Sequence, residues 1–335
     1  MGAPLARTPK SNSHSVDVAL RELSALRDAP AAELLPALRQ HLASKQNLVV
    51  AKAAEMTRDA NLSALAPELA GAFARFMIEP AKSDRGCGAK EAIARALYEL
   101  APPGNDAVEF VFISGIHHRQ LEGSYGPPID TASALRGWCA LGLVRIGYKR
   151  MHDELAELLA DPEPQARIMA ARAIAYAGHD TGTPLLRLKC LAGDREPEVL
   201  SECLLALGKL AGPRAATLIT RFLDSTDESI SATAALALGE MRSPLALAPL
   251  RARWSTKPHA QDRSPLLLPI ALSRLPEAID FLIEIIATAP EPLATEALQA
   301  MKMYRGDSAT RERLRAEVES RGSTLLITTF ASIFH

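Results

Sequence analysis

The chain has 335 residues, of which 48% are apolar and 23% charged, and its 38 basic residues against 39 acidic ones leave a net charge of −1. This balance lacks the basic field that nucleic-acid-binding proteins normally carry, and no apolar run approaches the roughly 18–20 residues that span a bilayer, so neither nucleic acid nor a membrane is an expected partner. Aromatic residues make up only 4%, and a core of Leu, Ala, Ile and Val favours packed helices over a sheet.

The N-terminal segment, residues 1–14, is predicted to be a disordered tail, followed by a capping helix over residues 15–27. The first residues, MGAPLARTPKSNSHS, lack the apolar core of a secretory signal. We therefore expect a cytoplasmic protein.

Amphipathic patterns between residues 31 and 305 predict about eight helical hairpins. Each unit has a loop with Asp, Pro or Glu, then an Ala/Leu-rich helix, a turn with Gly, Pro or Asp, and another amphipathic helix. Residues 161–192 show this pattern: Pro162 suits a first helical turn, where its missing N–H would be unpaired anyway, Gly178 ends the helix, and the next helix begins at Pro184. First helices are expected to begin near Ala31, Leu62, Gly104, Lys149, Thr181, Pro213, Pro244 and Pro276, and second helices near Lys45, Cys87, Asp130, Pro162, Arg195, Thr226, Ala260 and Glu291.

One hairpin is longer than the others. The step from Tyr98 to Gly142 is 44 residues, about 11 more than a normal repeat, and the surplus falls in residues 116–130, between the two helices of one hairpin. Insertions in solenoids project from one edge, often the binding edge, although a neutral surface insertion is the alternative because long loops cost little entropy. The candidate protein-binding residues of this edge loop are His117, His118, Arg119, Glu122 and Tyr125.

The edge loop also contains the sequence's best candidate for a metal site. On a helix, His118 and Glu122 would share a face, but the surrounding Gly and Pro residues predict a loop instead. Two histidines and one carboxylate are too few ligands without another from elsewhere. We therefore expect no metal and no cofactor.

A small residue recurs near the end of the Ala/Leu-rich helices. It stands at 142, 175, 208, 239 and 273, in steps of 33, 33, 31 and 34 residues. Glycine costs about 1 kcal/mol relative to alanine inside a helix, so its recurrence at Gly208 and Gly239 indicates a need for close helix packing.

The segments DPEPQARIMAARAIAYAG and PEVLSECLLALGKLAG, beginning at Asp161 and Pro197, resemble HEAT repeats of the short bacterial kind found in phycobilin lyases. The resemblance extends over about 130–305. It implies an all-α, right-handed α-solenoid, or superhelix, with one repeat domain over 15–322. Arg167 fits the arginine that such repeats often pair with an aspartate of the preceding turn, whereas Leu200 and Ser231 interrupt this ladder.

The C-terminal part is expected to close the array. Residues 307–320 are predicted to be a polar capping helix, and residues 323–335, STLLITTFASIFH, an apolar tail. Because this tail would be an aggregation hazard in water, we expect it to dock on the last hairpin or on another chain. The docking residues would be Leu325, Leu326, Ile327, Phe330 and Phe334.

Other residues with chemical potential do not form a pattern. The pairs at 152–153 and 179–180, both His-Asp, should not converge, and Trp138 is expected in the core. Cys87 follows Gly86 at a predicted helix start, where helix amides could lower its thiol pKa, but a buried, inert thiol is the alternative.

No catalytic residue is assigned, and the chain is not expected to be an enzyme. The sequence favours a non-catalytic scaffold or adaptor that binds another protein through the concave face or the edge loop 116–130. The alternative, which the resemblance implies, is a HEAT-repeat enzyme or chaperone acting on a modified protein or a tetrapyrrole, as a lyase does.

Overall fold

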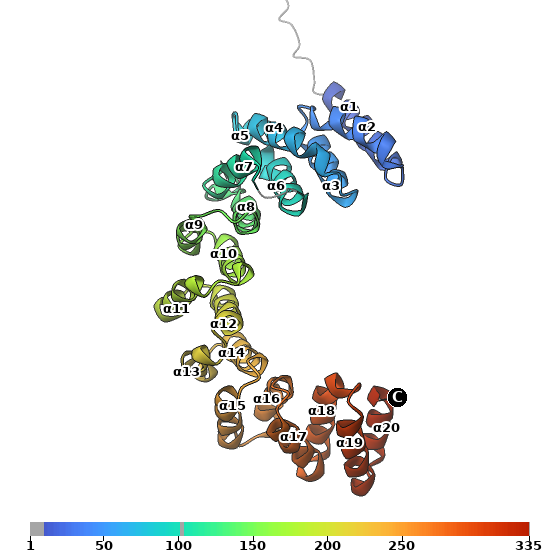
Figure 1. Ribbon diagram of the computed structural model, residues 1–335, viewed down its shortest axis with the longest axis vertical. Helices are drawn as coiled ribbons and strands as arrows, with labels where there is room; N and C mark the ends of the chain where they lie inside the picture. Colours follow the sequence, from blue (N-terminus) through green and yellow to red (C-terminus); the bar gives the residue numbers. More distant parts are fainter. Residues whose placement is uncertain (1–9, 101–103, 335) are drawn as a thin grey trace, which may run out of the picture. The chain divides into compact units, whose positions relative to one another are not determined.

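The computed structural model describes residues 10–100 and 104–334, and it divides into two compact units, Met1–Ala177 and Gly178–His335 (Figure 1). Both units are built from antiparallel helical hairpins, as the sequence predicts. Among the described residues, no helix combines the length and the apolar character that crossing a bilayer would require.

Unit 1 contains four hairpins preceded by a capping helix, α1 (Lys10–Ala25). The hairpins are α2 (Ala31–Leu42) with α3 (Asn47–Asp59), α4 (Ala66–Phe76) with α6 (Gly88–Leu100), α7 (Asp106–Ile116) with α8 (Ser133–Arg145), and α9 (Met151–Leu159) with α10 (Pro164–Ala177). A short helix, α5 (Pro80–Ser83), lies within the second hairpin. The second-helix layer, α3, α6, α8 and α10, has the closer contacts between neighbouring hairpins and lines the concave side of unit 1 in Figure 1.

Unit 2 also contains four hairpins, followed by two further helices. The hairpins are α11 (Thr183–Ala192) with α12 (Pro197–Ala211), α13 (Ala216–Thr220) with α14 (Glu228–Glu240), α15 (Pro244–Thr256) with α16 (Ala260–Leu272), and α17 (Pro276–Thr288) with α18 (Glu291–Ala300). The chain closes with α19 (Ser308–Arg321) and α20 (Thr324–Phe334).

The predicted starts of the hairpin helices agree with the structure to within four residues, and the described residues form the expected eight hairpins. The largest difference is at α4, because residues 63–65 form a 3₁₀ turn before the α-helix begins at Ala66. Local signals set these starts: Asn105 and Asp227 accept hydrogen bonds from the first backbone N–H groups of α7 and α14, and a proline occupies the first turn of α12.

The recurring glycines lie where helices approach, but the approach differs between them. A Cβ atom built on Gly239 would lie 2.2 Å from the backbone oxygen of Pro269 in α16, and one on Gly142 would lie 2.4 Å from the Phe112 ring. One built on Gly208 would meet Ala237 Cβ at 3.4 Å, close to an ordinary contact. The helix packing therefore requires glycine at position 239, whereas position 208 has room for a Cβ atom.

The predictions for both ends of the chain need a correction. Helix α1 already begins at Lys10, so the predicted disordered tail 1–14 is wrong for residues 10–14, and residues 1–9 lie outside the described residues. At the other end, α20 packs on α18 and α19 of the same chain and buries Leu326, Phe330 and Phe334. The expectation that Leu325 and Ile327 would also dock is wrong, since both are exposed.

Candidate functional site

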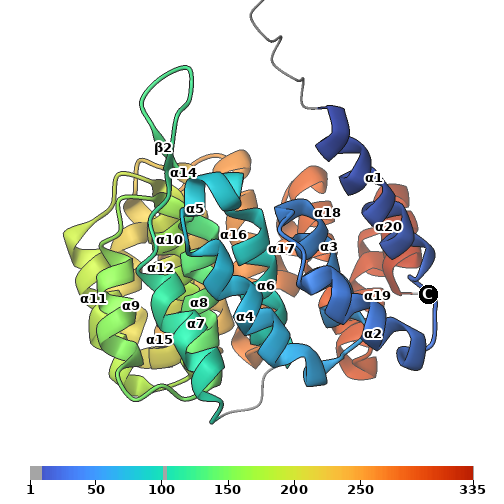
Figure 2. The ribbon, with the colours of Figure 1, turned by 90° about the horizontal axis from the view of Figure 1, so that it is seen from above.

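The edge loop 116–130 connects α7 to α8 and ends in a small β-hairpin. Strand β1 (Leu121–Glu122) pairs antiparallel with β2 (Ile129–Asp130), with Leu121 opposite Asp130. In Figure 2 this hairpin extends beyond the ends of α7 and α8. The expectation of an insertion between the helices of one hairpin is met, and the loop is more ordered than its Gly and Pro content indicates.

Glu122 anchors the base of the loop. Its Oε1 accepts hydrogen bonds from Gly86 N at 2.7 Å, Gln120 Nε2 at 2.6 Å and Thr131 Oγ1 at 3.0 Å. Glu122 is a predicted protein-binding residue, but these bonds all engage its Oε1, while its Oε2 lies 3.8 Å from the exposed Arg85 side chain. Its role here is to fix the loop on the turn before α6.

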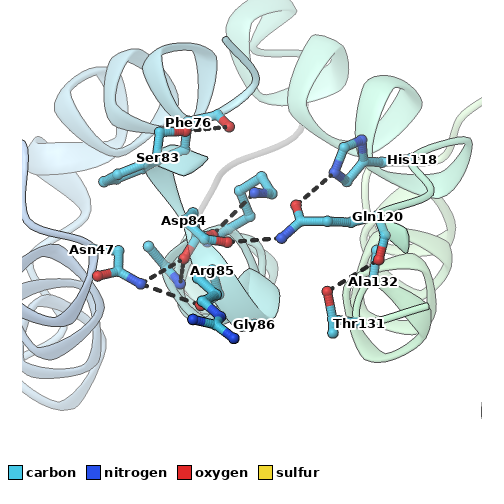
Figure 3. Close-up of polar contacts among 12 residues, drawn as sticks. Asn47, Phe76, Ser83, Asp84, Arg85, Gly86, His118, Gln120, Thr131 and Ala132 are labelled. Carbon is cyan, nitrogen blue, oxygen red and sulfur yellow. Dashed lines mark hydrogen bonds and ion pairs between the residues drawn. The ribbon is translucent and has the colours of Figure 1, made fainter. Parts of the chain in front are cut away.

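A polar cluster that adjoins Glu122 through Gln120 joins the loop to the second hairpin (Figure 3). Gln120 Nε2 donates to the backbone oxygen of Asp84 at 2.8 Å, and Gln120 Oε1 lies 3.2 Å from His118 Nε2. The Asp84 carboxylate accepts from the N–H groups of Ala89 and Lys90, each at 3.0 Å, at the start of α6. The Lys90 ammonium lies 3.1 Å from Asp84 Oδ2, a contact of charges without an aligned hydrogen bond. His118 thus turns into the molecule, where burial lowers its pKa.

Arg136 of α8 supports the loop from the other side. Its buried guanidinium donates to Asp130 Oδ2 at 2.8 Å, to the His118 carbonyl at 2.9 Å and to Asp161 Oδ1 at 3.0 Å. One arginine therefore ties both ends of the loop to the turn before α10. Paired and hydrogen-bonded charges of this kind are the form in which buried ions are tolerated.

The anchoring of the loop should depend on pH. Burial alone would raise the pKa values of Glu122 and Asp130, but the hydrogen bonds that each carboxylate accepts outweigh it, and both pKa values lie below their ordinary range. A carboxyl with a lowered folded-state pKa stabilises the structure above its unfolded-state pKa, and that contribution is lost as the pH falls through the folded-state value.

We therefore expect hydrogen exchange at the amides of Gln120 and Thr131 to lose protection below about pH 4. Glu122→Gln should lessen this dependence, because the amide does not titrate. Equal protection of wild-type amides at pH 3 and pH 7, after correction for the intrinsic exchange rate, would contradict this expectation.

The five predicted residues therefore do not form one surface. His118 and Glu122 turn inward, whereas His117 and Arg119 face α9 and the turn after it, 2.8 Å from Glu154 Oε2 and 3.3 Å from Asp161 Oδ2. Tyr125 alone stands fully exposed at the tip. Sequence reasoning identifies polar residues in a loop, but it cannot tell which of them point outward.

A second candidate site lies on the second-helix layer of unit 1. Tyr98 of α6 contacts Trp138 of α8 with ring centroids 5.8 Å apart, and it also contacts Tyr176 of α10 at 6.2 Å. Arg95 lies over the Trp138 ring at 5.0 Å, and Arg145 lies over the Tyr98 ring at 5.5 Å. We call these five residues the aromatic strip. It crosses three successive hairpins.

The aromatic strip is open to solvent. Tyr176 is 46% exposed, and Tyr98 and Trp138 are half-buried. On α6, the helix that carries Tyr98, burial raises the pKa of the Glu91 carboxyl, although Glu91 accepts a hydrogen bond from Trp138. The prediction that Trp138 belongs to the core is therefore only half correct. Sequence reasoning missed the strip because the three rings come from helices separated by loops of unequal length.

The four thiols are all buried. Desolvation raises the pKa of Cys87 to about 12, and both observations favour the predicted alternative of an inert thiol. Cys139, Cys190 and Cys203 are buried as well, and burial raises their pKa values too.

Comparison with known proteins identifies the repeats. The family model for HEAT repeats matches residues 152–230 and 186–268, so this part of the chain consists of HEAT repeats, as the resemblance implied. No curated protein matches the chain.

Three solved structures similar to this chain are each 18% identical to it or less. The complex of CpcE and CpcF of phycocyanin lyase from Nostoc sp. PCC7120 is 18% identical, with 70% of this chain and 89% of that chain covered and a TM-score of 0.39. The Escherichia coli protein YibA is 13% identical, with 90% and 99% covered and a TM-score of 0.48. Human deoxyhypusine hydroxylase is 17% identical, with 76% and 97% covered and a TM-score of 0.29.

Proposed function

We propose that this HEAT-repeat protein is a non-catalytic scaffold that binds another protein through the aromatic strip of unit 1. The observation that carries the proposal is the row formed by Tyr98, Trp138 and Tyr176, flanked by two arginines, on one open layer of helices. Tyr, Trp and Arg are the residues most enriched among those that dominate binding energy at protein interfaces.

The packing of the strip supports a binding role. Tyr98 contacts both other rings, and Arg95 and Arg145 stack on the aromatic faces, so few rotamers remain to be frozen when a partner binds. Fixing side chains beforehand lowers the entropic cost of association. Half-exposed rings also bury more apolar surface when a partner covers them.

The chemistry of the strip indicates the kind of partner segment. Aromatic faces accept aliphatic and aromatic side chains, and the two guanidinium groups favour carboxylates. Glu99 lies 3.7 Å from Arg95, but its side chain is 43% exposed, so water screens this pair. A segment of a partner protein that carries both acidic and apolar side chains fits this surface best.

Partner capture from the native host tests the proposal. Each of Trp138→Ala and Tyr176→Ala should weaken the captured complex by about 2 kcal/mol or more, roughly 30-fold in Kd, as is typical of central interface aromatics. The measurement is affinity capture with mass spectrometry, followed by titration of the purified partner.

Phe110→Ala is the matched control, because Phe110 is an exposed aromatic residue of the same unit that lies on α7 in the opposite layer. It should leave binding unchanged. A loop variant with residues 123–128 replaced by a Gly-Ser turn tests the other candidate surface, the edge loop. Full binding by both strip variants, with loss in the loop variant, would transfer the binding role to the edge loop.

A further inference from the structure

The edge loop begins beside three metal-ligating side chains that the sequence does not bring together. His117 follows the last turn of α7, and Glu154 and Glu157 lie one turn apart on α9. Their ligand atoms all lie within 4.8 Å of one another, around a pocket of about 90 Å³. We propose that His117, Glu154 and Glu157 form a binding site for a divalent transition-metal ion, with Zn²⁺ as the best fit.

The state of Glu154 supports this assignment. Its side chain is only 11% exposed, and its Oε2 is fully buried and directed at His117 Nε2 at 2.8 Å, without an aligned hydrogen bond. A buried carboxylate oxygen without a proper donor costs free energy, which a bound cation would recover.

The charges around the pocket also favour a cation. Asp161 and Arg119 both border the pocket and pair with each other at 3.3 Å, and Arg136 lies 3.0 Å from the other Asp161 oxygen, so these charges offset one another. Glu154 and Glu157 are left facing the imidazole of His117. An ion of charge +2 balances these two carboxylates, and a neutral imidazole is the form in which histidine binds metals.

The ligand types select the metal. One imidazole nitrogen and two carboxylate oxygens suit Zn²⁺, whereas Mg²⁺ and Ca²⁺ prefer sets of oxygen ligands. Bonds of about 2.0–2.2 Å to Zn²⁺ place tetrahedral ligands on the order of 3.4 Å apart. To reach this separation, His117 Nε2 and Glu154 Oε2 must move apart from 2.8 Å, and the ligand atoms up to 4.8 Å apart must approach, which takes rotations of the two outer side chains. These rotations are open to His117 and Glu157, which are both exposed.

Metal binding would link the edge loop to α9. His117 is the first residue after α7, so an ion shared with α9 fixes the point where the loop leaves its helix. The aromatic strip contributes no residue to this site, so the failure of one proposal leaves the other intact.

The test uses the full chain, freed of metal by a chelator and titrated with Zn²⁺ by calorimetry. We expect one Zn²⁺ per chain, a melting temperature that rises with the Zn²⁺ concentration, and much weaker binding of Mg²⁺. His117→Gln and Glu157→Gln should each weaken Zn²⁺ binding roughly 10–100-fold or more, because the loss of even an outer-shell partner typically has an effect of that size.

Asp153→Asn is the matched control, since Asp153 is an exposed carboxylate of the same helix outside the cluster. It should bind Zn²⁺ as the wild-type chain does. Visible absorption of bound Co²⁺ gives a second readout, and its bands should disappear in His117→Gln. A wild-type chain that binds no Zn²⁺, or one whose binding survives both ligand substitutions, would overturn the proposal.

Discussion

Replacing Gly239 with alanine is expected to destabilise the protein by about 1–3 kcal/mol, the usual cost of overpacking. The added Cβ would lie 2.2 Å from the oxygen and 2.9 Å from the carbonyl carbon of Pro269. These are backbone atoms of α16, so no side-chain rotation can relieve the clash, and the two helices must move apart.

Gly208→Ala is the matched comparison. Its Cβ would lie 3.4 Å from Ala237 Cβ, near ordinary van der Waals distance. Alanine gains about 1 kcal/mol over glycine inside a helix, so this variant should be neutral or more stable. Urea unfolding followed by circular dichroism compares the two. Equal midpoints for Gly208→Ala and Gly239→Ala would show that α14 and α16 do not approach as closely as the structure places them.

The contrast between Gly208 and Gly239 separates what the sequence predicts from what only the folded chain determines. The spacing of small residues predicts that Gly208 and Gly239 face neighbouring helices, because helical periodicity is a local property. It cannot rank the two positions. Which glycine tolerates a larger side chain less depends on Pro269. In the sequence α15 separates Pro269 from Gly239, and the backbone of Pro269 approaches Gly239 only in the folded chain.

The helix starts could be predicted for the same local reason. Prolines in first turns and caps such as Asp227 act within a few residues of the helix that they start. The 3₁₀ turns before α4 and α13 shifted the predicted starts, since a 3₁₀ turn shows the same apolar spacing as the first turn of an α-helix.

The candidate site was harder to predict because its contacts join distant residues. Glu122 is held by Gly86, and His117 meets Glu154, in each case across more than thirty residues. The sequence places His118 and Glu122 as neighbours in one loop. In the structure the first is half-buried beside Gln120, and the second is bound to the turn before α6.

Replacing Arg136 with methionine is expected to have the largest effect of any substitution considered, about 3–5 kcal/mol, because it leaves two buried carboxylates without their shared cation. Arg136 is only 1% exposed, and the side chains of Asp130 and Asp161 are 4% and 3% exposed. Methionine fills a similar length of apolar space, so the loss measured is mainly that of the charge.

The sign of the pH dependence identifies this cause. In the wild-type chain Arg136 is among the groups that lower the pKa of Asp130. Without Arg136, the folded-state pKa of Asp130 rises, and protonation relieves the buried charge. The penalty should therefore be largest at neutral pH and smaller below about pH 4, near the ordinary pKa of aspartate.

Two further variants complete the experiment. Arg136→Met combined with Asp130→Asn should recover part of the lost stability, because the double change removes one of the stranded charges. Arg150→Met is the control, since Arg150 pairs with Asp153 at an exposed surface and should matter little.

Urea unfolding gives the stability, and limited proteolysis within residues 123–128 reports whether the edge loop is still held. If Arg136→Met unfolds at the wild-type midpoint and its loop resists the protease equally, the arginine does not anchor the loop. If instead the loop is cleaved faster while the aromatic strip still binds its partner, the two surfaces act independently.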